Sequence, residues 1–219
     1  MKNSWLMLPW LFLIGGTALA DAPAFVEGAS YEAVSPAQPT EAKPSQVEVI
    51  EFFWYGCPVC FALEPHLEVW LKTKPKYVLY RRIPAAMKDS EFYTDSQAFY
   101  TAQLLGIGDK IHEPFFNAIH LDGQGELRTD VGALRTFFGK FGVASKDFDA
   151  TWNSFAVQTH MSEAALIEDR YGITGVPTII VNGKWKTGAG YRLASGAYMK
   201  GEDIMKCVDF LVKDRKSVV

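Results

Sequence analysis

Cys57 and Cys60 are separated only by Pro58 and Val59. Thiols three positions apart lie about one turn from each other on a helix, close enough to form a disulfide. The pair follows an apolar run and precedes a helical pattern. A cysteine at a helix N-terminus faces backbone N–H groups that have no partner within the helix, and these favour the thiolate. The spacing therefore predicts a redox-active dithiol in which Cys57 is the reactive sulfur.

The first twenty residues match a secretory signal. Lys2 supplies a positive start, residues 5–14 form an apolar run interrupted only by Pro9, and residues 18–20 read Ala-Leu-Ala, a small-x-small cleavage pattern. We predict cleavage after Ala20 and a soluble mature protein, and the alternative is an uncleaved N-terminal anchor. The formal net charge is -3 at pH 7. Neither nucleic acid nor an anionic membrane surface is therefore expected as a partner.

Export favours a disulfide over a metal site at Cys57 and Cys60, because disulfides persist in oxidising compartments. A zinc site would need more ligands, and Cys207 is the only other cysteine of the three. Covalent haem attachment would need a histidine where Phe61 stands. We expect no metal and no cofactor. A purely structural disulfide is the remaining alternative, although a link across two residues constrains little of the unfolded chain.

The elements that must position the thiols follow from apolar periodicity. Residues 47–53 are almost continuously apolar, which predicts a central strand covered on both faces. The helix after Cys57 carries an apolar stripe, and residues 77–83 read as a second strand. This β-α-β order predicts a parallel pair with a right-handed crossover.

The rest of the chain divides into a helical block and a hairpin. We predict helices at 89–105, 109–120, 129–141 and 146–171, the last of them interrupted. Two short strands around Asn182-Gly183 predict a hairpin, and a final amphipathic helix follows at 203–213. The proline-rich segment 21–46 is expected to be an extended arm with a short edge strand near 31–34.

These features together resemble the DsbA family of periplasmic thiol:disulfide oxidases. The matching segments are Glu-Phe-Phe at 51–53, the run 171–178 ending in Gly-Val-Pro-Thr, Val-Asn-Gly-Lys at 181–184, and 149–155. The resemblance implies an α/β, thioredoxin-like fold with an inserted α-helical domain. It divides the chain into a signal peptide (1–20), an arm (21–46), a thioredoxin-like domain (47–88 and 172–219) and the inserted helical domain (89–171).

The resemblance also implies a function. The chain would be an exported oxidoreductase that donates its Cys57–Cys60 disulfide to reduced polypeptides through a mixed disulfide. A quinone-linked membrane protein similar to DsbB would re-oxidise it in the periplasm, and we expect a monomer. The alternatives are a disulfide isomerase or reductase of the same fold, and a chaperone-like peptide-binding module.

Further site residues follow from the resemblance. Pro177 would be a cis-proline facing the thiols, and Val176 before it would pair with a substrate peptide, beside Pro58 and Val59. A trans proline at a strand start is the alternative. The family usually has histidine at the position of Val59. Valine can neither form hydrogen bonds through its side chain nor carry charge, so we predict a less oxidising couple.

Glu51 lies within the predicted central strand, where a buried acid is costly unless it is paired or functional. The resemblance implies that it passes protons near Cys60. The alternatives are a glutamate at an exposed strand end or one paired with a cation. The family's lysine on the next strand is absent, since residues 80–83 read Tyr-Arg-Arg-Ile, and this leaves the proton partner of Glu51 open.

Several other residues are given no functional role. Arg81 and Arg82 are expected to be solvated near a strand end, and Cys207 to be a buried small hydrophobe. The four histidines are expected to be surface or packing residues; they are His66, His112, His120 and His160.

Overall fold

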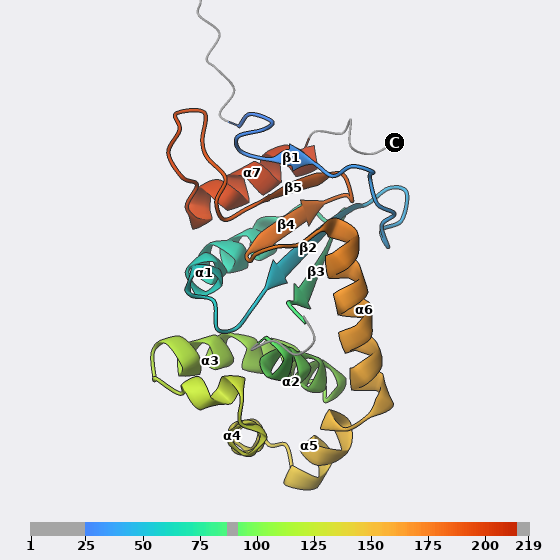
Figure 1. Ribbon diagram of the computed structural model, residues 1–219, viewed down its shortest axis with the longest axis vertical. Coiled ribbons are helices and arrows are strands. Elements are labelled where there is room, and N and C mark those ends of the chain that lie inside the picture. Colours follow the sequence, from blue (N-terminus) through green and yellow to red (C-terminus); the bar gives the residue numbers. More distant parts are fainter. Residues whose placement is uncertain (1–24, 87–91, 214–219) are drawn as a thin grey trace, which may run out of the picture.

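The computed structural model describes residues 25–86 and 92–213, so the predicted signal sequence lies outside the described residues. Five strands form one mixed sheet in the order β1-β5-β4-β2-β3 (Figure 1). Their bounds are β1 Glu32–Ala33, β2 Val47–Phe53, β3 Val78–Pro84, β4 Thr178–Val181 and β5 Trp185–Gly188. Strand β2 pairs parallel with β3 and antiparallel with β4, which confirms the predicted central strand and the β-α-β unit.

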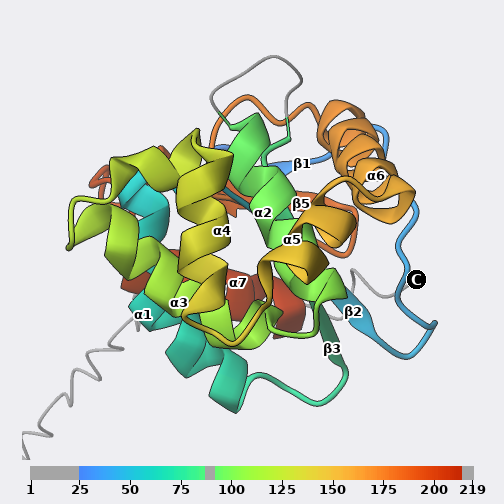
Figure 2. The ribbon, with the colours of Figure 1, turned by 90° about the horizontal axis from the view of Figure 1, so that it is seen from below.

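The helices lie on both faces and at one end of the sheet. Helices α1 and α7 cover one face, α6 covers the other, and α2 to α5 gather beyond the end of β2 (Figures 1 and 2). Their bounds are α1 Pro58–Thr73, α2 Tyr93–Leu104, α3 Gly108–His120, α4 Val131–Gly139, α5 Ser145–Trp152, α6 Phe155–Tyr171 and α7 Gly201–Lys213, with a 3-10 turn η1 at Gly125–Arg128.

Strand β2 is buried on both sides because its side chains alternate between two cores. Val47 and Val49 pack with α1 and α7, whereas Ile50 and Phe52 pack with α6. At its end, Phe53 enters a third, aromatic core formed with the helical block. The start of α1, which carries the two thiols, therefore lies where the sheet meets the inserted helices.

The predicted helices are present; residues 89–91 of the first one lie outside the described residues, and the others have shifted ends. The helix predicted at 129–141 is α4, which follows η1 and begins at Val131; Asp130 caps its first turn by accepting hydrogen bonds from the N–H groups of Gly132 and Ala133. The segment predicted at 146–171 is broken, as expected, where Ser154 caps α6 by accepting a hydrogen bond from Val157 N–H. A serine whose side chain accepts such a hydrogen bond marks the start of a new helix, so α5 and α6 are separate helices.

The hairpin β4–β5 turns through Asn182 and Gly183 as predicted, and both have positive φ, +52° and +65°. Pairing of β1 with β5 confirms the short edge strand in the arm. The division of the chain into domains stays a prediction; α6, assigned to the inserted domain, packs on the sheet as well as against α2. No helix within residues 25–86 and 92–213 has the length and apolar character needed to span a bilayer.

Candidate active site

Cys57 is the N-cap of α1, and Pro58 follows it in the first turn. Proline suits that position because its missing N–H has no partner there and its φ is already helical. The Sγ of Cys57 accepts a hydrogen bond from Cys60 N–H at 3.2 Å. Both cysteines are free thiols in this structure; Cys57 is 7% exposed and Cys60 is 0% exposed. Substrate access is therefore available at Cys57 and not at Cys60.

The two thiols differ in acidity as well as access. The hydrogen bond with the Cys60 thiol, helped by the backbone N–H groups of Cys60 and Val59, lowers the pKa of Cys57 to about 7 despite partial burial. Burial, and then the neighbouring Cys57, raise the pKa of Cys60 far above that of an ordinary thiol. Near neutral pH Cys57 is thus about half thiolate, whereas Cys60 keeps its proton.

The loop before β4 faces Cys57. The Val176–Pro177 peptide bond is cis, as predicted, and Cys57 Sγ lies 3.6 Å from the carbonyl oxygen of Val176. Pro58 and Val59 are exposed beside the thiols, Val59 by 49%. The four residues predicted to contact substrate are therefore the chain neighbours of Cys57 and of the peptide bond whose carbonyl group Cys57 contacts.

Glu51 is 0% exposed in the middle of β2, which rules out the exposed strand end. Its Oε2 accepts hydrogen bonds from the Tyr80 hydroxyl and from Arg82 Nε, the latter at 3.3 Å. Burial, and then the charge of Glu64, raise the pKa of Glu51 to about 7. A carboxyl group with this pKa can hold or release a proton near neutral pH.

Arg82 corrects the expectation of a solvated strand end. Its side chain is only 14% exposed and donates from Nη2 to Glu64 at 3.0 Å and to Glu68 at 2.9 Å, in addition to Glu51. The parallel register of β2 and β3 places Arg82 opposite Glu51. Arg82 and Tyr80 therefore occupy the side of Glu51 where the family's lysine was missing. The sequence did not predict this pairing, because the strand predicted at 77–83 begins one residue before β3 and therefore gives a different register.

His112 is a packing residue, as expected, in contact with several aromatic rings, and it also makes polar contacts that were not expected. It is 4% exposed, its Nδ1 lies 2.8 Å from the Tyr55 hydroxyl, and its Nε2 lies 3.4 Å from Glu64 Oε1. His120, about two turns further along α3, contacts the Tyr55 carbonyl oxygen through Nε2 at 2.7 Å. The sequence carried no local signal for these contacts, because Tyr55 and Glu64 are distant in sequence from their partners on α3.

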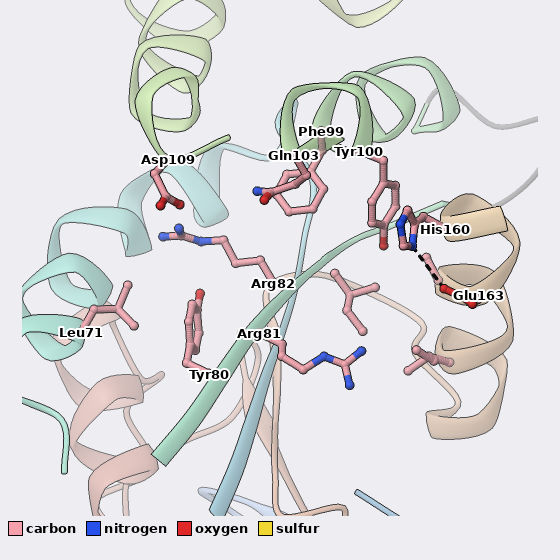
Figure 3. A pocket seen from close by; sticks show the side chains of 13 residues that line it. Leu71, Tyr80, Arg81, Arg82, Phe99, Tyr100, Gln103, Asp109, His160 and Glu163 are labelled. Carbon is pink, nitrogen blue, oxygen red and sulfur yellow. Dashed lines mark hydrogen bonds and ion pairs between the residues drawn. The ribbon is translucent and has the colours of Figure 1, made fainter. Parts of the chain in front are cut away.

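A cavity of about 480 Å³ opens beside the edge strand β3 and reaches the outer side of this cluster. Figure 3 shows Arg81 and Arg82 pointing to opposite sides of β3, with Tyr80 and Asp109 on the side of Arg82. The remaining wall comes mainly from α2 and α6, including the ion pair of His160 with Glu163. The cavity thus reaches Tyr80 and Arg82, the two donors to Glu51, and neither thiol is part of its lining.

Cys207 is 0% exposed on α7, as expected for a small buried hydrophobe, and burial raises its pKa to about 11. Its thiol donates to the carbonyl oxygen of Ser30 at 3.6 Å. Within the described residues, no three His, Cys, Asp or Glu side chains form a group suited to holding a metal ion.

Comparison with known proteins places this geometry in a family. Residues 81–194 match the model of the DSBA-like thioredoxin domain. The thiol:disulfide interchange protein DsbA of Burkholderia cepacia is 40% identical over 181 residues, which are 83% of this chain and 84% of that protein. The Pseudomonas aeruginosa DsbA is 34% identical over 211 residues, 96% of this chain and 94% of that protein.

Solved structures agree with the sequence relatives. The crystal structure of Pseudomonas aeruginosa DsbA superposes with a TM-score of 0.76 at 31% identity, covering 88% of this chain and 95% of that one. DsbA from Xylella fastidiosa gives 0.77 at 26% identity, covering 89% and 99%. The isomerase or reductase alternative is not favoured by these relatives. The chain belongs to the DsbA family of thiol:disulfide oxidoreductases.

Proposed function

We propose that Cys57 and Cys60 carry the exchange reaction and that the chain donates their disulfide to reduced polypeptides. The observation that supports this most strongly is the asymmetry of the two thiols. Cys57 is the more accessible and has a pKa of about 7, whereas Cys60 is completely buried with a raised pKa. Cys57 is the leaving group when the mixed disulfide is resolved, and a thiol of low pKa departs quickly. Its stable thiolate also favours the reduced form of the protein, which is the property of a disulfide donor.

The electrons and protons balance in two exchange steps. A substrate thiolate attacks Cys57 Sγ, the Cys57–Cys60 bond breaks, and Cys60 leaves with the electron pair and takes up a proton. A second substrate thiolate then attacks the substrate sulfur of the mixed disulfide and releases the Cys57 thiolate. The substrate loses two electrons, and the dithiol returns them to the disulfide of an oxidant.

We assign the proton exchanged at Cys60 to Glu51. Its carboxyl is fully buried, its pKa of about 7 suits transfer near neutral pH, and its charge is one of the causes that raise the pKa of Cys60. Val176 and Pro177, with Pro58 and Val59, would line the path of the substrate peptide over Cys57, since Pro58 and Val59 are exposed next to this thiol and the Val176 carbonyl lies against its Sγ.

We place this activity in the periplasm, with a DsbB-like membrane protein as oxidant and with the chain acting as a monomer. The support is the signal pattern of residues 1–20 together with the family. Cell fractionation tests the location, and the oligomeric state can be measured by sedimentation.

Trapping of the mixed disulfide tests the roles of the thiols. Cys60→Ser, activated at Cys57 with a coloured leaving thiol, should react with a reduced polypeptide and retain it covalently. The matched variant Cys57→Ser, treated in the same way, should capture little, because Cys60 is buried. Cys207→Ser serves as the control and should behave as the unmodified protein. Equal trapping on Cys60 would contradict the assignment.

A further inference from the structure

One guanidinium faces three carboxyl groups in the cluster beneath the thiols. Arg82 contacts Glu51, Glu64 and Glu68, and the first two carboxyl groups are buried. A single positive charge cannot balance two buried carboxylates as well as the half-exposed carboxylate of Glu68, so a buried carboxyl keeps a proton near neutral pH. Arg82 does not determine whether Glu51 or Glu64 keeps this proton, because it donates to both.

The other hydrogen-bond donors do distinguish the two acids. Glu64 accepts from Arg82 Nη2 at Oε2, and its Oε1 lies 3.4 Å from His112 Nε2. Glu51 receives both of its donors, Tyr80 and Arg82, at Oε2. Its Oε1 is buried without a hydrogen-bond partner among the described residues. Glu64 thus has a nitrogen close to each oxygen, whereas Glu51 has one oxygen available to carry a proton.

Tyr55 determines which nitrogen of His112 faces Glu64 as a donor. Burial raises the pKa of Tyr55 well above its usual range and lowers that of His112 to about 3, so the hydroxyl keeps its proton and the imidazole is neutral. The Tyr55 hydroxyl lies 2.8 Å from Nδ1, the one partner it has in the described structure. If the hydroxyl donates to Nδ1, the ring proton must be on Nε2, directed at Glu64.

The contact of 3.4 Å is long for a hydrogen bond, and His112 Nε2 and Glu64 Oε1 both lack another partner among the described residues. A buried donor and a buried acceptor left unpaired cost about 1–3 kcal/mol each. A small movement that brings Nε2–H into a hydrogen bond with Oε1 gives both atoms a partner. The geometry therefore favours the Nε2–H form over the alternative, in which the Tyr55 hydroxyl would lose its acceptor.

We propose that His112 is a positioning residue of the redox site: held by Tyr55, it stabilises Glu64 as the anion and leaves the exchangeable proton on Glu51. This inference rests on the role proposed for Glu51 and brings helix α3 of the inserted block into the chemistry. The charged and titratable groups that act on His112, Glu64 and Tyr55 from the surrounding elements are Glu51, Glu68, Tyr80, Arg82, Asp95, Asp109 and Glu113.

The step that isolates the proton transfer is the attack of Cys60 on a mixed disulfide already formed between Cys57 and glutathione. Its rate should rise with pH as Glu51 becomes able to accept the proton. In His112→Leu, Glu64 loses a donor and takes up the shared proton, so Glu51 loses a negative neighbour and titrates at lower pH. The midpoint should fall by about one pH unit. His112→Gln, which keeps an N–H donor, should bring the midpoint most of the way back to that of the unaltered protein.

Two further variants separate this mechanism from a packing defect. Tyr55→Phe keeps the ring and frees the tautomer, so its midpoint should also fall. Glu64→Gln should lower the midpoint by itself, and on that background His112→Leu should add nothing, because the carboxylate it stabilises is gone. His160→Leu, which breaks the exposed pair with Glu163, is the matched control and should not move the midpoint.

The results separate the two proposals. If Glu51→Gln leaves the pH dependence intact, the assignment of Glu51 is wrong. If Glu51→Gln abolishes it while His112→Leu and Tyr55→Phe leave the midpoint in place, only the role of His112 is overturned. The same holds if His112→Leu acts equally with and without Glu64. In the unaltered protein, ¹⁵N shifts should show a neutral His112 with its proton on Nε2, and a proton on Nδ1 would overturn the inference.

Discussion

Val59 lies between the two thiols with nearly half of its surface exposed, yet it contributes neither charge nor a side-chain hydrogen bond to Cys57. The thiolate therefore depends on the Cys60 thiol, the backbone N–H groups and the start of α1. Reduced and oxidised forms differ in this interaction, because only the reduced form contains the thiolate. The residue at position 59 is thus a point at which the reduction potential can be changed without altering the fold.

Replacing Val59 with histidine should lower the pKa of Cys57 below about 7 and raise the reduction potential. An added interaction of about 1.4 kcal/mol with the thiolate corresponds to roughly 30 mV for this two-electron couple. Equilibration with glutathione measures the potential, and thiolate absorbance measures the pKa. Val59→Leu, which adds no charge, should leave both unchanged. A potential that is unchanged or lower in Val59→His would contradict this role of the side chain.

At the scale of elements, the hairpin β4–β5 supports the loop that faces Cys57. The N–H of Ala189 donates to the Pro177 carbonyl oxygen at 3.0 Å, and Gly188 lies directly against the same carbonyl. A Cβ at Gly188 would come within 2.3 Å of that oxygen, and its φ of +145° is unfavourable for other residues. The end of β5 therefore requires glycine so that the two chain segments can approach.

Gly188→Ala should destabilise the protein by about 2–3 kcal/mol and reduce the rate of disulfide transfer, because the loop at Val176 must move away from Cys57. Chemical denaturation measures the first effect and single-turnover oxidation of a peptide the second. Gly139→Ala is the matched control: no atom would contact its Cβ, its φ is not positive and it lies in α4, so stability should stay equal or rise slightly. Equal stability of the two variants would contradict the argument.

The elements were largely predictable because each has a local cause. Val47–Phe53 is apolar throughout, the Asn182-Gly183 turn suits a tight hairpin, and Cys57-Pro58 starts a helix. The exact ends were not predictable where a cap decides them, as at Ser154. Caps depend on single side chains, which periodicity does not reveal.

At the scale of the whole molecule, the site was predictable only where its residues are close in sequence or match the family. Cys57, Cys60 and Glu51 share one strand–helix junction. His112 reaches that junction from α3, and Arg82 was expected to be solvated because it lies near the predicted end of its strand. Their burial is a result of how the helical block packs on the sheet, which no local pattern contains.

This packing also predicts an unusual dependence of stability on pH. Burial raises the pKa values of Glu51 and Glu168 from 4.5 to about 7, so between these values the folded chain binds more protons than the unfolded chain. Their contribution to stability is complete below pH 4.5 and is lost as the pH rises through 7. His112, with its pKa lowered to about 3, opposes this below pH 6.5 but is a single group.

The net result is that the reduced protein should be more stable near pH 5 than at pH 7.5, by on the order of 2 kcal/mol, since one unit of pKa shift corresponds to about 1.4 kcal/mol. Urea unfolding across this range measures the slope. Glu168→Gln is the informative variant, because an amide oxygen can still accept the hydrogen bond that Ala86 N–H donates to Glu168 Oε1 at 2.9 Å. The variant should therefore fold normally and show a shallower slope. A free energy of unfolding that increases from pH 5 to 7.5 would mean that these carboxyl groups are ionised in the folded protein, and that the cluster beneath Cys60 holds no proton to exchange.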